Sequence, residues 1–322
     1  MNETLIVKTA PKRSLSIPTT LILLVALAGL VAVFAAVSRD FYSSYNLVSM
    51  VTNMTFLGIT AIGFCINLVA GEVDISIGAN IALTSCVTAF AYDAGLPIGV
   101  CIAAGLMVGL LLGFLNALVI TLFKVNSLIV TLGTMSIAQG IAYTMTHGLS
   151  ILVMEDVLGF FGRGTVGPVP FPIIVLAVLT LVFTVLLNST KFGREVKAVG
   201  SNARVAYLSG IKVKRIKFIT ITLCAVMASV SGLLIASMSA VGMPQHGIGQ
   251  EFPIISAVIL GGASLSGGRG SVVGSIVGIL IMAVIYNGLV MLNIPSYTVE
   301  MIRGIILILI VASYEIRDRR KR

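Results

Sequence analysis

The chain has 322 residues, of which 57% are hydrophobic and only 10% are charged. A soluble globular domain carries about 25% charged residues, and the mean hydropathy of +1.09 leaves too few polar groups to cover a surface in water. The net charge of +9 could suit nucleic acid, but the basic residues gather at the two ends and in one central block. Orientation in a bilayer explains that distribution better, so the composition favours an all-α integral membrane protein and argues against a nucleic-acid partner.

Apolar stretches long enough to cross the hydrocarbon core as a helix, about 20 residues each, recur along the chain. They are 18–37, 47–70, 97–123, 127–147, 171–188, 218–240, 271–292 and 297–316. Two further stretches, 76–92 and 252–267, are shorter or richer in glycine. Counting both, we predict a bundle of about ten transmembrane helices that includes broken or short Gly/Ser-rich segments. The first stretch is too long for the apolar core of a signal peptide and is predicted to be an anchor.

The distribution of lysine and arginine predicts that both chain ends lie in the cytoplasm, because cytoplasmic loops carry an excess of these residues. With ten crossings, Arg39 and Arg163 fall outside and Arg303 lies within the last span. Most of the 21 basic residues fall inside: the N-terminal tail, Lys124, the block from Lys191 to Lys217, Arg269 and residues 317–322. The predicted organisation is a cytoplasmic tail 1–17, one transmembrane domain 18–316 with a cytoplasmic loop 189–217, and a basic cytoplasmic tail 317–322.

Small residues recur at helix-packing spacing in two rows, Gly105–Gly109–Gly113 and Gly270–Gly274–Gly278. Such rows allow helix backbones to approach closely in lipid, so we predict that they pack helices together. Residues 68–85 also resemble residues 258–275, since each joins an apolar run to a broken Gly/Ser stretch and then to another span. A parallel internal repeat and chance similarity both remain open.

Acidic and polar side chains interrupt the apolar sequence at 70–83. Carboxylates at membrane depth are functional candidates by default, so Glu72, Asp74, Ser76 and Asn80 are predicted to line a substrate pathway. Two structural alternatives stay open: Asp74 and Ser76 cap the following helix, and Glu72 is merely solvated. Ser264 and Ser266, in the glycine-rich stretch 261–270, are further pathway candidates because an unwound backbone there could face a polar ligand.

The loop 189–217 contains a short amphipathic helix over about 202–208, with Asn202 as its N-cap and Gly210 as its stop. Its apolar face, formed by Val205, Ala206 and Leu208, could dock into the groove of a partner protein or lie on anionic lipid. On the opposite side, the long connection 147–170 is predicted to be an interfacial helix or a lid.

Catalytic and metal-binding patterns are missing. The sequence has no G-x-x-x-x-G-K-[ST] phosphate loop and no H-E-x-x-H zinc motif. The four cysteines lie inside apolar stretches without metal-ligand spacing and are interpreted as packing residues. We therefore predict no catalytic residue, no metal site and no cofactor in this chain.

Several stretches together resemble one known family. AGEVDISIGANIAL (70–83) is similar to the GGIDLSVGS motif of monosaccharide ABC-importer permeases, the ribose permease group. VTLGTMSIAQGIAYTMTHG (130–148), the block 190–218 after its T-x-x-G-R turn, and GGASLSGGRGSVVGS (261–275) followed by NGL (287–289) resemble further segments of the same family. Order and spacing agree over nearly the whole chain.

The resemblance implies a permease subunit of the bacterial cell (inner) membrane that translocates a monosaccharide or small polyol. It implies partner ATPase subunits, which would bind ATP and Mg²⁺, a second permease copy or paralogue, and an extracytoplasmic sugar-binding protein. Asp74, Ser76 and Gly78 would belong to the pathway motif. The residues expected to couple the permease to the ATPase are Gly200, Asn202, Ala206, Ser209 and Gly210.

The chain departs from the family pattern at a few positions. Glu72 stands where glycine is common, and Ser201 and Arg204 replace the usual glycine and acidic residue of the loop. Two other functions remain as alternatives: an ion-coupled secondary transporter, which would need intramembrane acids such as Glu72 and Asp74 as ion sites, and a membrane enzyme, for which the sequence lacks paired carboxylates or a nucleophile–histidine pair. The identity of the sugar stays open.

Overall fold

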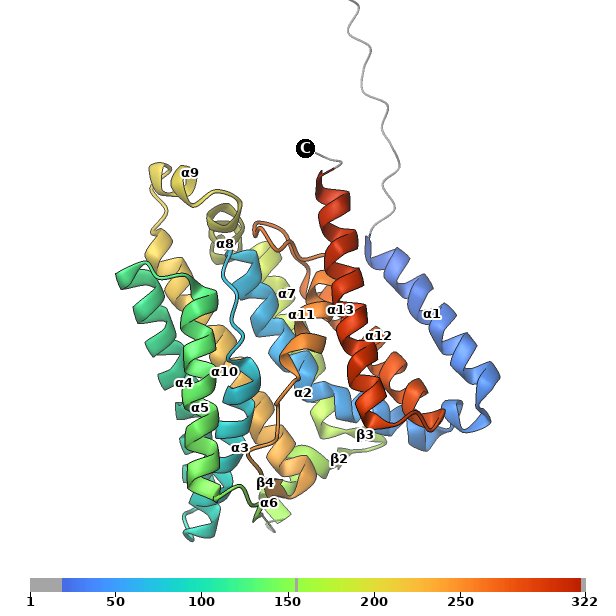
Figure 1. Ribbon diagram of the computed structural model, residues 1–322. Coiled ribbons are helices and arrows are strands. Elements are labelled where there is room, and N and C mark those ends of the chain that lie inside the picture. The colour runs from blue at the N-terminus through green and yellow to red at the C-terminus, as the bar shows by residue number, and fades with distance from the viewer. Residues whose placement is uncertain (1–18, 154–155, 320–322) are drawn as a thin grey trace, which may run out of the picture.

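The computed structural model describes residues 19–153 and 156–319, so the predicted tail 1–17 and residues 320–322 of the basic tail lie outside the described residues. The long helices, shown in Figure 1, are α1 (Thr19–Val37), α2 (Ser44–Val69), α3 (Ile77–Asp93), α4 (Ile98–Phe123), α5 (Ser127–Thr146), α7 (Phe171–Ser189), α10 (Val213–Ser239), α12 (Val272–Met291) and α13 (Ser296–Arg319). The shorter elements are η1 (Arg39–Tyr42), β1 (Ile151–Leu152), α6 (Asp156–Arg163), β2 (Thr165–Val166), β3 (Val169–Pro170), α8 (Lys191–Ser201), α9 (Ala203–Leu208), β4 (Val241–Gly242) and α11 (Glu251–Leu260).

Helix α2 lies at the centre of the bundle and packs against α7, α10, α11 and α12 (Figure 1). Helices α3, α4, α5 and α10 form one side group, while α1, α12 and α13 form the other. We call the upper end of Figure 1, which holds α8, α9 and the end of α13, the α8–α9 end. The opposite end, which holds α6 and the short strands, is the α6 end.

The surface of the bundle is apolar where a soluble protein would be polar. Leu111, Leu115, Leu122 and Phe123 of α4 are more than half exposed, as is Ile129 of α5. In the described part of the chain, six helices are long and apolar enough to cross a membrane: α2, α4, α5, α7, α10 and α12. The prediction of a polytopic, all-helical membrane protein is therefore confirmed.

The two weak segments form helices, but one is shorter than predicted. The stretch 76–92 coincides with α3, whereas the prediction of a span over 252–267 is wrong beyond Leu260. The chain leaves α11 through Gly262, at a φ of +96°, and turns again through Gly267 and Gly268, at +81° and +78°. Only glycine adopts such left-handed backbone readily, and a count of apolar residues cannot detect it.

Helices α2 and α11 end in the same way, which supports the resemblance between 68–85 and 258–275. The amide of Glu72 bonds the carbonyl of Asn67 and that of Gly71 bonds Leu68, while Ala263 and Gly262 repeat these two bonds to Val258 and Ile259. This pair of bonds around a left-handed glycine is the Schellman motif. Both helices run toward the α8–α9 end in Figure 1, as a parallel repeat requires.

The predicted packing role of the glycine rows is confirmed in α4 and in most of the second row. A Cβ added at Gly109 or Gly113 would meet the main chain of α10, at Ala225 and Thr222 respectively. Gly274 and Gly278 face α11 in the same way. Gly270 precedes α12 and instead lies against the Val69 side chain at the end of α2. These contacts bring the helix pairs α4–α10 and α11–α12 together.

Some elements were not predicted from the sequence. Helix α8 occupies the first part of the basic loop, and two short antiparallel pairs, β1 with β4 and β2 with β3, lie at the α6 end. Helix α6 supports the prediction of a short helix in the connection 147–170. Its Phe160 and Phe161 pack against Phe171 at the start of α7, with ring centroids 5.1 Å and 5.7 Å away.

Candidate substrate pathway and coupling surface

Asp74 and Ser76 are buried together where the chain enters α3. The Asp74 Oδ1 accepts hydrogen bonds from the Ser76 amide at 2.8 Å and from the Ser76 hydroxyl at 2.5 Å. Asn116 of α4 donates to the same hydroxyl at 3.3 Å, and Thr134 of α5 donates to Asn116. Asp74 therefore caps the turn that opens α3, whereas Ser76, at the N-cap position, makes no capping bond with its side chain.

Asn80 joins α3 to α10 deep in the bundle. Its Nδ2 donates to the carbonyl of Ala225 at 2.9 Å, and its Oδ1 accepts from Thr84 and Ser229 at 3.2 Å and 3.1 Å. Both ends of the amide are thus engaged by the protein. Only the second hydrogen of Nδ2 is left for another partner, so the geometry supports a packing role for this residue.

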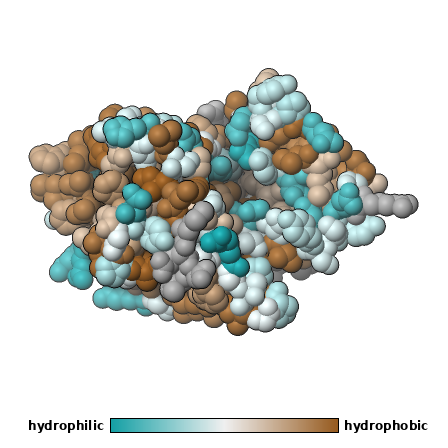
Figure 2. All heavy atoms as spheres, turned by 90° about the horizontal axis from the view of Figure 1, so that it is seen from below, coloured by the Kyte–Doolittle hydropathy of each residue, from teal (hydrophilic) through white to brown (hydrophobic). Residues whose placement is uncertain are grey.

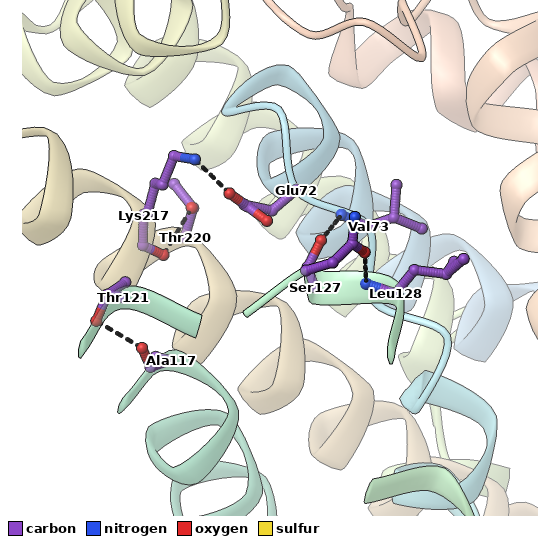
Figure 3. Close-up of polar contacts among 9 residues, drawn as sticks. Glu72, Val73, Ala117, Thr121, Ser127, Leu128, Lys217 and Thr220 are labelled. Carbon is purple, nitrogen blue, oxygen red and sulfur yellow. Dashed lines mark hydrogen bonds and ion pairs between the residues drawn. The ribbon is translucent and has the colours of Figure 1, made fainter. Parts of the chain in front are cut away.

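Glu72 is buried and forms an ion pair, so the alternative that it is merely solvated does not hold. Figure 3 shows its side chain pointing from the unwound segment after α2 toward Lys217 of α10, whose Nζ lies 2.5 Å from Oε1. In the same view the Ser127 hydroxyl, at the start of α5, accepts from the Val73 amide at 3.3 Å. Glu72 and Lys217 thus hold the unwound segment against α10.

Ser264 and Ser266 lie in the turn between α11 and α12. Their hydroxyls are 2.8 Å apart, and the Ser264 amide donates to the carbonyl of Arg269. Among the described residues, no hydrogen bond joins these serines to Asp74, Ser76 or Asn80. The structure therefore separates the predicted pathway residues into an α3–α4–α10 group and a turn at the α8–α9 end.

Two cavities lie beside α2, and the sequence did not identify the residues that line them. One of about 350 Å³ lies between α2, α11, α12 and α13, and a second of about 860 Å³ lies between α2, α10 and the 162–170 segment. They share Asn53 and Phe56. The polar groups of the first are Asn53, Gln250, Ser256, Tyr286, Asn287 and Arg303. Figure 2 looks onto the α6 end and shows polar and apolar side chains mixed around a hollow near its centre.

Several of these polar groups hold one another in place. The Arg303 guanidinium lies 4.3 Å from the centroid of the Tyr286 ring and pairs with Glu300 at 2.6 Å. Asn287 exchanges hydrogen bonds with Asn46 at the start of α2. The available signal in the sequence was the presence of Asn53, Asn287 and Arg303 inside otherwise apolar spans, which is the pattern expected for polar groups that face a cavity.

Glu251 is a further buried acid that the sequence did not single out. It is buried at the start of α11, and a Cβ added at Gly78 would collide with its carboxylate and with the carbonyl of Gly247. Gly78 of the predicted pathway motif is thus required for the close crossing of α3 and the 241–250 segment.

Helix α9 has the predicted caps and an exposed apolar face. The Asn202 side chain accepts from the amides of Arg204 and Val205, each at 3.0 Å, and Gly210 ends the helix at a φ of +82°. The predicted face of Val205, Ala206 and Leu208 is wrong at one position: Ala206 is buried, whereas Val205, Tyr207 and Leu208 are 57%, 71% and 77% exposed. The surface available to a partner is therefore formed by these three side chains, while Asn202, Ala206 and Gly210 shape it.

Ser209 and Gly200 lie on either side of this surface. The Ser209 hydroxyl donates to the Val205 carbonyl within α9. Gly200 is the penultimate residue of α8 and contacts the end of α2. No cluster of three or more metal-binding side chains occurs in the described ranges 19–153 and 156–319.

Comparison with known proteins places the chain in a family. Residues 46–311 match the family described as "Branched-chain amino acid transport system / permease component". The chain is 33% identical over 283 residues to an L-arabinose ABC transporter permease of Azospirillum brasilense, covering 88% of this chain and 84% of the relative. No solved structure matches.

Ribose permeases show similar agreement. Identity is 31% over 292 residues with the ribose import permease of Escherichia coli (strain K12), covering 89% of this chain and 91% of that protein. With the ribose import permease of Bacillus subtilis (strain 168) it is 33% over 294 residues, covering 91% and 90%. The chain therefore belongs to this family of permease components, as a multi-pass transport subunit of an ABC importer in the bacterial inner membrane and not as an enzyme.

Proposed function

We propose that the chain conducts a monosaccharide or small polyol into the cell, driven by ATP hydrolysis on a separate subunit. The observation that carries this proposal is agreement over about nine-tenths of the chain with permeases named for ribose, and similar agreement with one named for L-arabinose. The cavity along α2 supports it, because amides, hydroxyls and an aromatic ring are the groups that recognise sugars.

We propose ten crossings with both chain ends in the cytoplasm. The long helices together with α11 alternate in direction along the chain in Figure 1, and α3 and α11 each cross together with the non-helical segment that precedes them. Lys124, Arg269 and the basic residues of α8 to α10 lie at the α8–α9 end, which is then the cytoplasmic end. The α6 end faces the outside and receives the sugar.

The substrate route follows α2 inward from the α6 end through the two cavities. The inner cavity of about 350 Å³ falls within the size range of small-molecule sites, about 300–1,000 Å³. Beyond it, α2 is continuously buried from Gly58 to Val69, so the route is closed toward the α8–α9 end. Weak contacts suit this role, since tight binding would slow release.

Branched-chain amino acids are the second candidate substrate, because the family description names them. An amino acid brings a carboxylate, for which an unpaired cation would be the strongest partner. The one cation that lines the inner cavity in the described part of the chain, Arg303, is paired with Glu300. The sugar is therefore the better fit.

The partners follow from this scheme. The exposed side chains of α9 contact the ATPase, which holds ATP and Mg²⁺. A second copy or a paralogue completes the transmembrane part, and a sugar-binding protein docks at the α6 end. The predicted pathway residues Asp74, Ser76 and Asn80 then position α3 and do not touch the sugar, Glu72 anchors the unwound segment, and Ser264 and Ser266 lie at the inner end of the route.

The test uses the permease reconstituted in liposomes with its genomic ATPase and binding protein. Asn53→Ala and Gln250→Ala should each lower sugar uptake about tenfold, since one lost hydrogen bond to a polar substrate removes roughly 1.4 kcal/mol. Thr180→Ala, on α7 and outside both cavities, is the matched control. Unchanged uptake in both variants would refute the route, and wild-type uptake of leucine instead of pentoses would establish the second candidate.

A further inference from the structure

Three segments that are distant in the sequence meet main chain to main chain at the α8–α9 end. The Gly268 amide, between α11 and α12, donates to the carbonyl of Val69 at the end of α2 at 2.8 Å. A Cβ added at Gly200 of α8 would overlap that carbonyl and lie 2.5 Å from the Gly268 nitrogen. A Cβ at Gly267 would lie 2.8 Å from the Gly200 oxygen and 3.0 Å from the Gly71 Cα. We call Val69, Gly71, Gly200, Gly267 and Gly268 the glycine junction.

The glycine at position 200 is explained by this contact and not by its own backbone. Gly71, Gly267 and Gly268 have φ between +78° and +87°, which favours glycine locally. Gly200 is the penultimate residue of α8, where the backbone is helical and alanine has the higher helix propensity. Its missing side chain allows the backbones of α2, α8 and the 261–271 turn to touch.

Each arm of the junction continues into a different part of the proposed machinery. Gly200 leads through Asn202 into α9, whose exposed face is the proposed ATPase contact. Gly71 leads into Glu72 and the unwound entry to α3. The turn with Gly267 follows α11, and the residue before α11, Gln250, lines the inner cavity. The glycine junction thus joins α8 and α9 to the segment 70–76 after α2 and to the 261–271 turn after α11.

We propose that the glycine junction transmits movement of α8 and α9 to two unwound segments, residues 70–76 after α2 and the 261–271 turn after α11. Gly200 is the positioning residue. This inference rests on the proposed function. Main-chain contacts contain no flexible side chain that could absorb a displacement, so a shift of α8 moves the end of α2 and the 261–271 turn together. Packed contacts of this kind change between discrete arrangements and do not deform continuously. In this scheme Gly200 acts through its contact with the end of α2.

The first test is Gly200→Ala in the complete importer, with Gly29→Ala in α1 as control because nothing lies within 4 Å of its Cβ position. The ATPase that copurifies with Gly200→Ala is quantified first, so that uptake and hydrolysis are compared per assembled complex. Uptake by Gly200→Ala should fall at least tenfold per assembled complex, and sugar-loaded binding protein should no longer stimulate hydrolysis. Wild-type uptake and stimulation per assembled complex would overturn the inference.

A second pair of variants keeps the test decisive if Gly200→Ala fails to assemble. A Cβ at Gly270 would collide with the Val69 side chain, so Gly270→Ala should reduce stimulated hydrolysis and Val69→Ala should restore it in the double variant. Absence of rescue, with both proteins folded, would overturn the relay. A wild-type complex that hydrolyses ATP but imports no sugar would instead contradict the proposed function.

Discussion

The ion pair between Glu72 and Lys217 should respond differently to the loss of each partner. Lys217→Met leaves a carboxylate whose side chain is 8% exposed without its cation, and breaking a fully buried pair costs about 3–5 kcal/mol. Because the Lys217 side chain is 27% exposed, water reaches that end of the pair. We therefore expect the free energy of unfolding to fall by about 2–3 kcal/mol. Glu72→Gln keeps a hydrogen-bond acceptor and lets Lys217 turn to water, so the expected loss is about 1 kcal/mol.

The assay is unfolding in detergent near neutral pH, with all variants in the same buffer. The double variant Glu72→Gln/Lys217→Met should be more stable than Lys217→Met alone, because the uncompensated charge has gone, and the cycle should give a coupling energy of about 1–2 kcal/mol. Lys214→Met, at an exposed position three residues earlier in α10, should be close to neutral. If Lys217→Met is no less stable than Lys214→Met, the ion pair does not anchor the unwound segment.

The remaining predictions concern capping, packing and coupling. Asn202→Ala should destabilise α9 by about 1 kcal/mol through loss of its N-cap, which would be visible as weaker ATPase association in pull-down; unaltered association would contradict the proposed surface. Asn202→Arg or Gly210→Arg should uncouple hydrolysis from transport in a folded bundle, and normal uptake in both would count against α9 as the coupling element. Gly109→Ala should cost about 1–3 kcal/mol in thermal unfolding because its Cβ meets α10, whereas Gly140→Ala, in open space on α5, should cost nothing; equal effects would refute close α4–α10 packing. Asp74→Ala should lower uptake while Asp74→Asn, which keeps an acceptor for Ser76, should retain most of it; full uptake in Asp74→Ala would make the turn dispensable.

Apolar length and charge were sufficient to predict most of the fold. A run of about 20 apolar residues can satisfy its backbone in lipid only as a helix, so α2, α4, α7 and α12 follow directly from the sequence. The caps of α9 were also predictable, because Asn202 and Gly210 act through local backbone geometry.

The site was predicted less well because its contacts are long-range. Spacing alone could not show that Glu72 finds its cation 145 positions away at Lys217, or that Asn80 is engaged by Ser229. The sequence grouped Gly200 with the residues expected to couple to the ATPase, but it could not show that Gly200 also touches the end of α2. Asn53 and Gln250 are each a single polar residue in the sequence, and only the fold brings their side chains to the same cavity.

The central claim is tested most directly by sugar uptake into liposomes that contain the permease and its ATPase, with binding protein outside and nucleotide inside. We predict that labelled ribose or L-arabinose accumulates only when ATP and Mg²⁺ are enclosed, and that an imposed proton gradient does not replace them. Uptake that follows the proton gradient and ignores ATP would contradict this account and establish an ion-coupled transporter.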